Sequence, residues 1–252
     1  MNKRILSVAI GLFLVLTMAN MTMAAQKHVL LIGKPDQTSL WAEYLSADPE
    51  LEITEANEPD LDESSELFAP EALASYDAIV LGELVMGAAN NGSVVMPAKI
   101  QEAIKERVAA GAGFVHVGGW CAYQGGCDDW AGLWHGTPID EILPVDISAS
   151  WDTNDDGTQI PRLNQANHPI VADLDWRAVT RVGGYNKVTV AEGGTVVMSD
   201  PKSKDPLIVV GTYGEGKTVA YTGGFAGGWD EDFIRWSDFP KLWIQLVRYL
   251  AD

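Results

Sequence analysis

Short apolar runs recur along the first half of the chain. Four of them have the length and apolar content of buried or half-buried strands: HVLLIG (28–33), LEITEA (51–56), DAIVLGE (77–83) and FVHVGG (114–119). The segment between the third and fourth run, residues 97–113, has helical spacing: Pro97 is typical of a helix start, Gly111 of a helix stop, and apolar residues recur between them. Strands that alternate with amphipathic helices predict a mainly parallel sheet with helices on both of its faces.

The pattern changes after Gly119. Residues 119–136 form a loop rich in Gly, Trp and Asp, and TPIDEIL (137–143) is then expected to be a short helix with Thr137 as its N-cap. From residue 179 onward, shorter strand signals are separated by turns, which predicts added β-hairpin strands in the C-terminal half. FPKLWIQLVRYL (239–250) has an apolar stripe and is expected to be the closing helix.

The N-terminal segment has the features of a secretory signal. Lys3 and Arg4 precede the apolar run ILSVAIGLFLVL, and small residues follow up to Ala25. We therefore expect a signal peptide over residues 1–25 and one domain over residues 26–252, exported to the periplasm or the extracellular space. A retained N-terminal anchor is the alternative. No other apolar run is long enough to span a membrane, so no membrane association is expected after cleavage.

The expected mature chain is strongly acidic. The full chain has a formal net charge of -18, and without Lys3 and Arg4 it keeps 15 basic and 35 acidic residues, a net charge of -20. A surface of this charge repels phosphate backbones and anionic lipids. Nucleic acids and membrane surfaces are therefore excluded as expected partners.

Two cysteines, Cys121 and Cys127, follow the fourth apolar run. Export to an oxidising compartment favours a disulfide between them. The alternative is catalysis, because a sharp glycine turn after a parallel strand places a side chain at the carboxyl edge of the sheet, where α/β proteins usually bind ligands. In this alternative Cys121 is the nucleophile, Glu83 ends at the same edge, and His135 or His168 is the base.

The two glycines of this turn, Gly118 and Gly119, permit its geometry, and their amides are candidate oxyanion donors. Aromatic residues cluster in the glycine-rich loops around the turn and are typical of amphipathic contact surfaces, including platforms for sugars. Packing of these rings over the sheet edge is the alternative. The expected binding residues are Gly118, Gly119, Trp120, Tyr123, Gln124, Trp134 and Trp229.

Two further motifs point to other ligands. GTYGEGKT (211–218) matches a phosphate-binding loop letter by letter, but an alternating β-branched run follows it instead of a helix, so a hairpin turn is expected. DTNDDG (152–157) resembles the first half of a calcium loop, with oxygen ligands at Asp152, Asn154 and Asp156, although an ordinary acidic turn also explains it. The four histidines lack zinc spacing. No cofactor is expected, with bound calcium as the alternative.

Several sequence blocks, in this order, resemble the putative glutamine amidotransferase family of the class I glutamine amidotransferase-like superfamily, which is related to trehalose-utilisation-type domains. They are GAGFVHVGGW, YQGG, GTPIDEILPV, NHPI, GGYN, PLIVVGTYGEGKTVAYT and WSDFPKLWIQLVRYL. The resemblance implies a flavodoxin-like three-layer sandwich and, by name, transfer of ammonia from glutamine.

The residues of that chemistry are incomplete in this chain. Active class I members carry G-x-C-x-G-x-Q at the turn and a late H-x-E, whereas here Tyr123 replaces the second glycine, Gln124 arrives one place early, and no histidine follows His168. We therefore expect an amidotransferase-like domain without that glutaminase chemistry, which binds a small, carbohydrate-like ligand or a protein partner at the sheet edge. The alternative is an amidase or hydrolase that uses Cys121.

Overall fold

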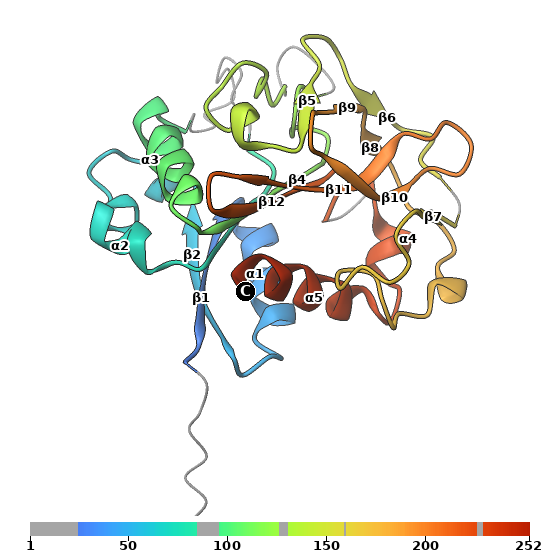
Figure 1. The fold of residues 1–252 in the computed structure, drawn as a ribbon, viewed down its shortest axis with the longest axis horizontal. Coiled ribbons are helices and arrows are strands. Elements are labelled where there is room, and N and C mark those ends of the chain that lie inside the picture. Colours follow the sequence, from blue (N-terminus) through green and yellow to red (C-terminus); the bar gives the residue numbers. More distant parts are fainter. Residues whose placement is uncertain (1–24, 85–95, 126–130, 159, 226–228) are drawn as a thin grey trace, which may run out of the picture.

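The computed structural model describes residues 25–84, 96–125, 131–158, 160–225 and 229–252. Its main feature is an eight-stranded sheet in the order β2-β1-β3-β4-β12-β11-β10-β7 (Figure 1). The strands are β1 (Lys27–Gly33), β2 (Leu51–Asn57), β3 (Ala78–Leu81), β4 (Gly113–Val117), β7 (Arg162–Leu163), β10 (Thr195–Ser199), β11 (Pro206–Tyr213) and β12 (Gly216–Tyr221). The first five in the sheet order are parallel, and β11, β10 and β7 follow, each antiparallel to the strand before it in the sheet. The predicted mainly parallel α/β sandwich with C-terminal hairpin strands is confirmed.

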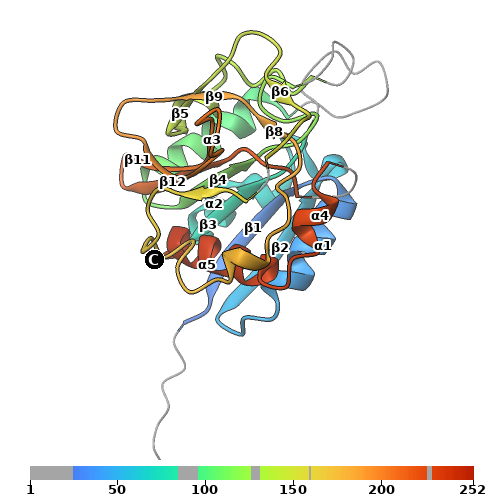
Figure 2. The ribbon, with the colours of Figure 1, turned by 90° about the vertical axis from the view of Figure 1, so that its right-hand side faces the viewer.

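Helices cover both faces of this sheet. The helices are α1 (Pro35–Leu45), α2 (Pro70–Ser75), α3 (Ala98–Ala109), α4 (Glu231–Ile234) and α5 (Phe239–Ala251), with 3-10 turns at Glu58–Asp60, Glu66–Phe68, Asp140–Ile142 and Trp176–Ala178. Helices α1 and α5 lie side by side on one face, and α2 and α3 lie together on the other (Figures 1 and 2). None of the helices in the described part of the chain is long and apolar enough to cross a membrane.

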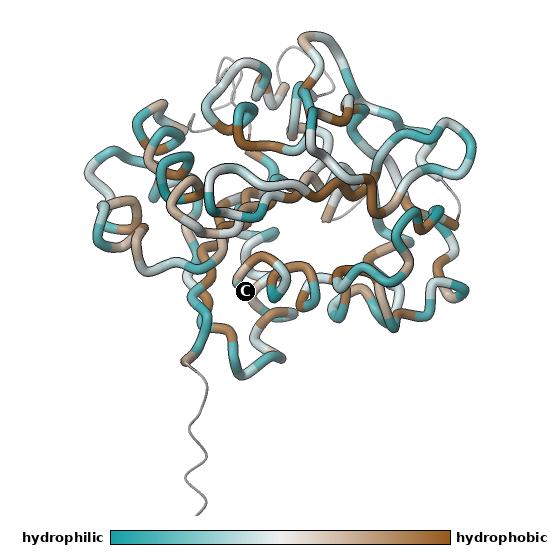
Figure 3. Tube along the Cα trace, in the orientation of Figure 1, coloured by the Kyte–Doolittle hydropathy of each residue, from teal (hydrophilic) through white to brown (hydrophobic). Residues whose placement is uncertain are grey.

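The two cores follow from the alternation of side chains along each strand. Val29 and Leu31 of β1 point into the core beneath α1 and α5, whereas Leu30 and Ile32 point into the core beneath α2 and α3. All four side chains are fully buried, which explains why the strand reads as a continuous apolar run. Figure 3 shows the hydrophobic strands inside the molecule and hydrophilic segments around them.

Two short strand pairs lie outside the main sheet. They are β5 (Val145–Ile147) with β9 (Val188–Val190), and β6 (Thr153–Asn154) with β8 (Tyr185–Asn186). Strand β8 lies at the carboxyl end of β12, because Tyr185 bridges Gly223 and the Asn186 N–H donates to the Thr222 carbonyl at 3.0 Å. The loops that carry the candidate site therefore converge at this edge.

The prediction of a helix over TPIDEIL (137–143) is wrong. TPIDEIL forms only the 3-10 turn Asp140–Ile142, because Pro144 holds Leu143 in an extended conformation (ψ 150°) and stops the helix. Thr137 Oγ1 still accepts from the Asp140 N–H at 3.3 Å.

The GTYGEGKT motif spans the β11–β12 hairpin turn, as predicted, and no helix N-terminus follows it to hold phosphates.

Candidate functional site

The turn after β4 needs glycine at two successive positions. A Cβ on Gly118 would lie 2.1 Å from the Thr222 carbonyl oxygen, so the backbone of β4 passes too close to β12 for any side chain. Gly119 has φ +154°, and a Cβ there would lie 2.7 Å from a carboxylate oxygen of Glu83. This close approach brings the carboxyl ends of β3, β4 and β12 together around one turn.

The amides of this turn are already engaged by protein acceptors. Gly118 N–H donates to the Tyr221 carbonyl at 2.7 Å, Gly119 N–H to Asn186 Oδ1 at 2.9 Å, and Cys121 N–H to Glu83 Oε1 at 2.5 Å. An oxyanion hole needs donors that point at the reacting oxygen. In this structure the amides of Gly118 and Gly119, expected to be such donors, hold the turn in place instead.

Glu83 anchors the turn from the end of β3. Gln37 of α1 donates from Nε2 to Glu83 Oε2 at 3.0 Å, and its Oε1 accepts the Glu83 N–H at 3.1 Å. Lys34 Nζ lies 3.8 Å from the same carboxylate oxygen. With donors from Gln37, Lys34 and Cys121 around it, the Glu83 carboxylate is placed to position the backbone of Cys121.

Cys121 is buried, with 4% of its surface exposed. The structure brings it together with Glu83 through the backbone contact, as their shared sheet edge predicts. Cys127 lies outside the described residues, so the pairing of the two cysteines stays a prediction.

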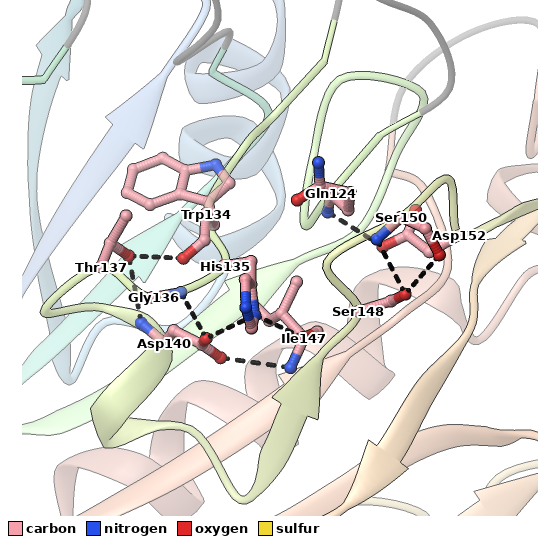
Figure 4. A network of polar contacts seen from close by, with 10 residues as sticks. All are labelled: Gln124, Trp134, His135, Gly136, Thr137, Asp140, Ile147, Ser148, Ser150 and Asp152. Atoms are coloured by element: carbon pink, nitrogen blue, oxygen red, sulfur yellow. Dashed lines mark hydrogen bonds and ion pairs between the residues drawn. The ribbon is translucent and has the colours of Figure 1, made fainter.

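Asn186 and Asp152 hold the next part of the loop. Asn186 Nδ2 donates to Asp152 Oδ1 at 3.0 Å while its Oδ1 accepts from Gly119. Asp152 in turn accepts the N–H of Gln124 at 2.9 Å (Figure 4) and the N–H of Gly125 at 3.1 Å. Burial raises the pKa of Asp152 to about 6, although these hydrogen bonds lower it. One buried carboxylate therefore organises the loop from three donors.

The three residues of the calcium-like loop are used separately. Asp152 faces the Gln124–Gly125 amides, and Asn154 Oδ1 accepts the Asp156 N–H at 3.1 Å within the exposed turn. Among the residues that the structure describes, no three His, Cys, Asp or Glu side chains gather in a way that could hold a metal. Calcium at Asp152, Asn154 and Asp156 stays a prediction without a gathered ligand set.

Tyr123 and Trp134 lie beneath the loop. Both are fully buried and enclose His116, whose ring stacks on Tyr123 at 4.5 Å and meets Trp134 edge-on at 5.2 Å. Tyr123 also donates from its hydroxyl to the His116 carbonyl at 3.0 Å. These two expected binding residues therefore match the packing alternative, in which aromatic rings cover the sheet edge.

All four histidines of the chain lie in described residues, and each has its own environment. Burial lowers the pKa of His116 to about 3, which keeps it neutral. His135 Nδ1 bonds to the Ile147 carbonyl at 2.8 Å and lies 3.5 Å from Asp140 (Figure 4). His28 pairs with Glu52 at 2.9 Å.

His168 lies at the opposite edge of the sheet from Cys121. Its ring contacts Tyr249 of α5 at 4.9 Å, and the Tyr249 carbonyl accepts from Lys217 at 2.9 Å. Lys217 is at the start of β12, which runs parallel to β4, so this contact marks the amino ends of these strands. Of the predicted triad, Glu83 and Cys121 meet, His168 is remote, and His135 is bonded to Ile147.

Two tryptophans meet at the surface of the same edge. Trp120, 42% exposed, lies 6.4 Å from Trp229 with the rings nearly perpendicular. Trp229 donates from Nε1 to Asp155 at 3.0 Å, and its indole occupies the space that a Cβ on Gly184 would fill, 1.7 Å away. We call Trp120 and Trp229 the tryptophan pair.

Asp230 is a fully buried carboxylate next to this pair. Its Oδ1 accepts the Gly183 N–H at 2.6 Å, and its Oδ2 has no hydrogen-bond partner among the described residues. Burial raises its pKa to about 7, against the lowering effects of the Gly183 and Gly224 amides and of Arg181. The Gly224 amide lies near this carboxylate without completing a hydrogen bond to Oδ2.

A family model described as "Putative glutamine amidotransferase" matches residues 51–252. The chain belongs to this family. The matched residues run from β2 to the C-terminal end, and β1 and α1 precede them in the chain. None of the curated proteins matches the chain significantly.

Solved structures share the fold of this amidotransferase-like chain. Cytoplasmic protein STM1381 from Salmonella typhimurium LT2 superposes with a TM-score of 0.76 at 20% identity, over 89% of this chain and 100% of that one. Cytoplasmic protein STM3548 from Salmonella typhimurium gives 0.75 at 20% identity, over 88% and 98%. Agd3, described as a carbohydrate deacetylase, gives a TM-score of 0.58 at 14% identity, over 90% of this chain and 32% of that one. At these identities the likeness concerns the fold alone.

The departure from the amidotransferase motif at Tyr123 has a local explanation. Tyr123 has φ +50°, a left-handed conformation in which the family's pattern has glycine. The hydroxyl bond to His116 and the ring stacking hold the tyrosine in this conformation. A buried aromatic residue therefore stands where the motif of active amidotransferases has glycine.

Sequence reasoning missed four residues of this amidotransferase-like site: Gln37, Asp152 as a loop organiser, Asn186 and Asp230. Asn186 stands in the GGYN block and Asp230 follows GGW, so the glycine-rich blocks were the available signal. Gln37 sits in a helix with no distinguishing pattern.

Proposed function

We propose that this protein binds a small, carbohydrate-like molecule at the tryptophan pair and that it lacks glutaminase activity. The engagement of the Gly118, Gly119 and Cys121 amides carries the proposal. Hydrolysis of an amide through a thiolate develops negative charge on oxygen, and catalysts stabilise it with free, preorganised donors. Here the amides of the turn donate to protein acceptors that hold the turn in place.

The histidines support the same proposal. A general base works best with a pKa near the working pH, and burial holds His116 far below it. His135 bonds to a backbone carbonyl, and His168 lies at the far edge of the sheet. The rings of His135 and His168 are thus engaged in other contacts, and His116 is held neutral in the core.

The tryptophan pair supports ligand binding. Exposed aromatic faces next to polar groups are typical of carbohydrate sites, where an apolar sugar face stacks on a ring and hydroxyls bond to acids. Trp229 is pre-positioned by Asp155 and by its fit against Gly184. Trp120 is exposed enough to offer its ring to a ligand.

A tryptophan variant tests this proposal. We expect maltose, glucose or galactose to bind saturably, measured by titration calorimetry, and Trp120→Ala to weaken that binding at least about tenfold through loss of stacking. Trp151→Ala is the matched control, because Trp151 is 66% exposed and its Nε1 bonds to Thr153. The control is expected to bind like the wild type.

Two results would contradict the proposal. One is that none of the three sugars binds, or that both tryptophan variants lose binding equally. The other is release of ammonia from glutamine by the wild type that disappears in Cys121→Ala. The second result would establish the cysteine-dependent alternative with Glu83 as a positioning residue.

The proposal includes export. The N-terminal signal features over residues 1–25 and the acidic mature chain support a periplasmic or extracellular protein. In that compartment a disulfide between Cys121 and Cys127 would fix the glycine-rich loop locally. No nucleic acid, membrane or cofactor is part of the proposed function.

A further inference from the structure

One hollow of the structure is lined by residues other than those of the glycine turn. It encloses about 450 Å³, within the range of small-molecule sites, and its charged lining residues are Arg181, Lys202, Asp156 and Asp200. Exposed Ile160 and Pro201 supply an apolar wall. Neither Trp120 nor Cys121 lines it.

Hydrogen bonds tie the walls of this hollow together. Thr158 and Val182 exchange both backbone hydrogen bonds, at 3.0 and 2.9 Å, which fixes Arg181 beside the 156–158 turn. Asp200 is buried and accepts from the N–H of Lys202 at 2.6 Å and of Ser203 at 2.8 Å. The side chains of Arg181 and Lys202 therefore project from a preformed frame.

The two cations at this hollow have no ion-pair partner among the described residues, although the charge of Arg181 also acts on the buried Asp230 carboxyl. Among the described residues neither Arg181 nor Lys202 forms an ion pair, and the one side-chain hydrogen bond of Arg181 goes to the Asp156 carbonyl at 3.0 Å. In a chain with 35 acidic and 17 basic residues, two unpaired cations at one hollow are a departure from the general charge. A guanidinium with free donors matches the geometry of a carboxylate.

Two carboxylates in the lining, Asp156 and Asp200, restrict which class of ligand fits the hollow. The charge of Asp200 is taken up by the amides of its own turn and the Thr158 hydroxyl. Asp156 is exposed at the rim, where its carboxylate can accept hydroxyl groups and repels a doubly charged phosphate. We propose that this hollow binds a small monocarboxylate that carries several hydroxyls, a sugar acid, with its carboxylate on Arg181 and Lys202 and its hydroxyls toward Asp156.

Titration calorimetry with D-glucuronate on the full chain tests this site. We expect saturable binding that weakens at least about tenfold in Arg181→Gln and in Lys202→Gln, since each removes a charge-assisted hydrogen bond. Lys204→Gln is the matched control: Lys204 is exposed, donates to the Pro201 carbonyl and does not line the hollow. Acetate, which lacks hydroxyls, and inorganic phosphate are expected to bind more weakly than glucuronate.

The site is overturned if glucuronate does not bind, if Lys204→Gln weakens it as much as Arg181→Gln, or if phosphate binds more tightly. Circular dichroism of each variant checks the fold, and these exposed positions are expected to keep it. Trp120→Ala separates this site from the proposed sugar site, because it should leave glucuronate binding unchanged while it weakens maltose binding. Loss of glucuronate binding in Trp120→Ala would also overturn the second site.

Discussion

At the scale of single residues, burial shifts the pKa of the Asp230 carboxyl. Its carboxylate is completely removed from solvent, yet the hydrogen bond from Gly183 and the nearby charge of Arg181 do not offset the desolvation, so its pKa is raised to about 7. Between the usual value of 3.8 and about 7, the folded protein holds a proton that the unfolded chain has released. The contribution of Asp230 to stability is therefore fullest below pH 4 and is lost as the pH rises toward 7.

Asp230→Asn removes this titration while keeping an oxygen that can accept from Gly183. We expect the variant to gain stability relative to the wild type, by on the order of 3 kcal/mol, between pH 4.5 and 7.5, measured by urea denaturation. Asp232→Asn, at an exposed neighbouring position, is the control and should follow the wild type. If the wild type and Asp230→Asn differ by the same amount at both pH values, the buried carboxyl does not titrate as inferred.

At the scale of elements, the sequence predicts those features that a local pattern of residues determines. The buried strands were predictable from their continuous apolar runs, and α3 from apolar positions at helical spacing between a start and a stop signal. The meeting of Glu83 and Cys121 was predictable too, because parallel strands end at the same edge. The Gln37–Glu83 and Gly119–Asn186 bonds were not, since they join residues 46 and 67 positions apart without a pattern.

Helix α5 illustrates how an amphipathic element carries stability. Leu246 is fully buried in the core, whereas Ile244 in the same helix is only partly buried. We expect Leu246→Ala to lower the free energy of unfolding by about 3 kcal/mol, because it removes contacts and leaves a cavity under the sheet. Ile244→Ala should cost about 1 kcal/mol in the same urea titration. Equal losses would mean that the stripe does not pack as described.

At the scale of the molecule, this chain has the fold of the family, and we propose that it lacks the family's chemistry. The sheet order, the two helical layers and the hairpin strands agree with the amidotransferase-like fold. The turn after β4 carries the buried Tyr123 and is fixed by Glu83 and Asn186. A fold supports many functions, so the loops and not the scaffold decide what is bound.

The covalent state of the whole chain gives a test of export. Expressed with its complete sequence in a Gram-negative host, the protein is expected in the periplasm, cut after Ala24 or Ala25. Its non-reduced, denatured form should take up no maleimide, because we expect Cys121 and Cys127 to form a disulfide in that compartment. Intact-mass measurement before and after reduction determines both whether the signal has been cleaved and whether the two thiols are oxidised. A full-length mass in the cytoplasm contradicts export, and two labelled thiols in periplasmic protein contradict the disulfide while leaving export standing.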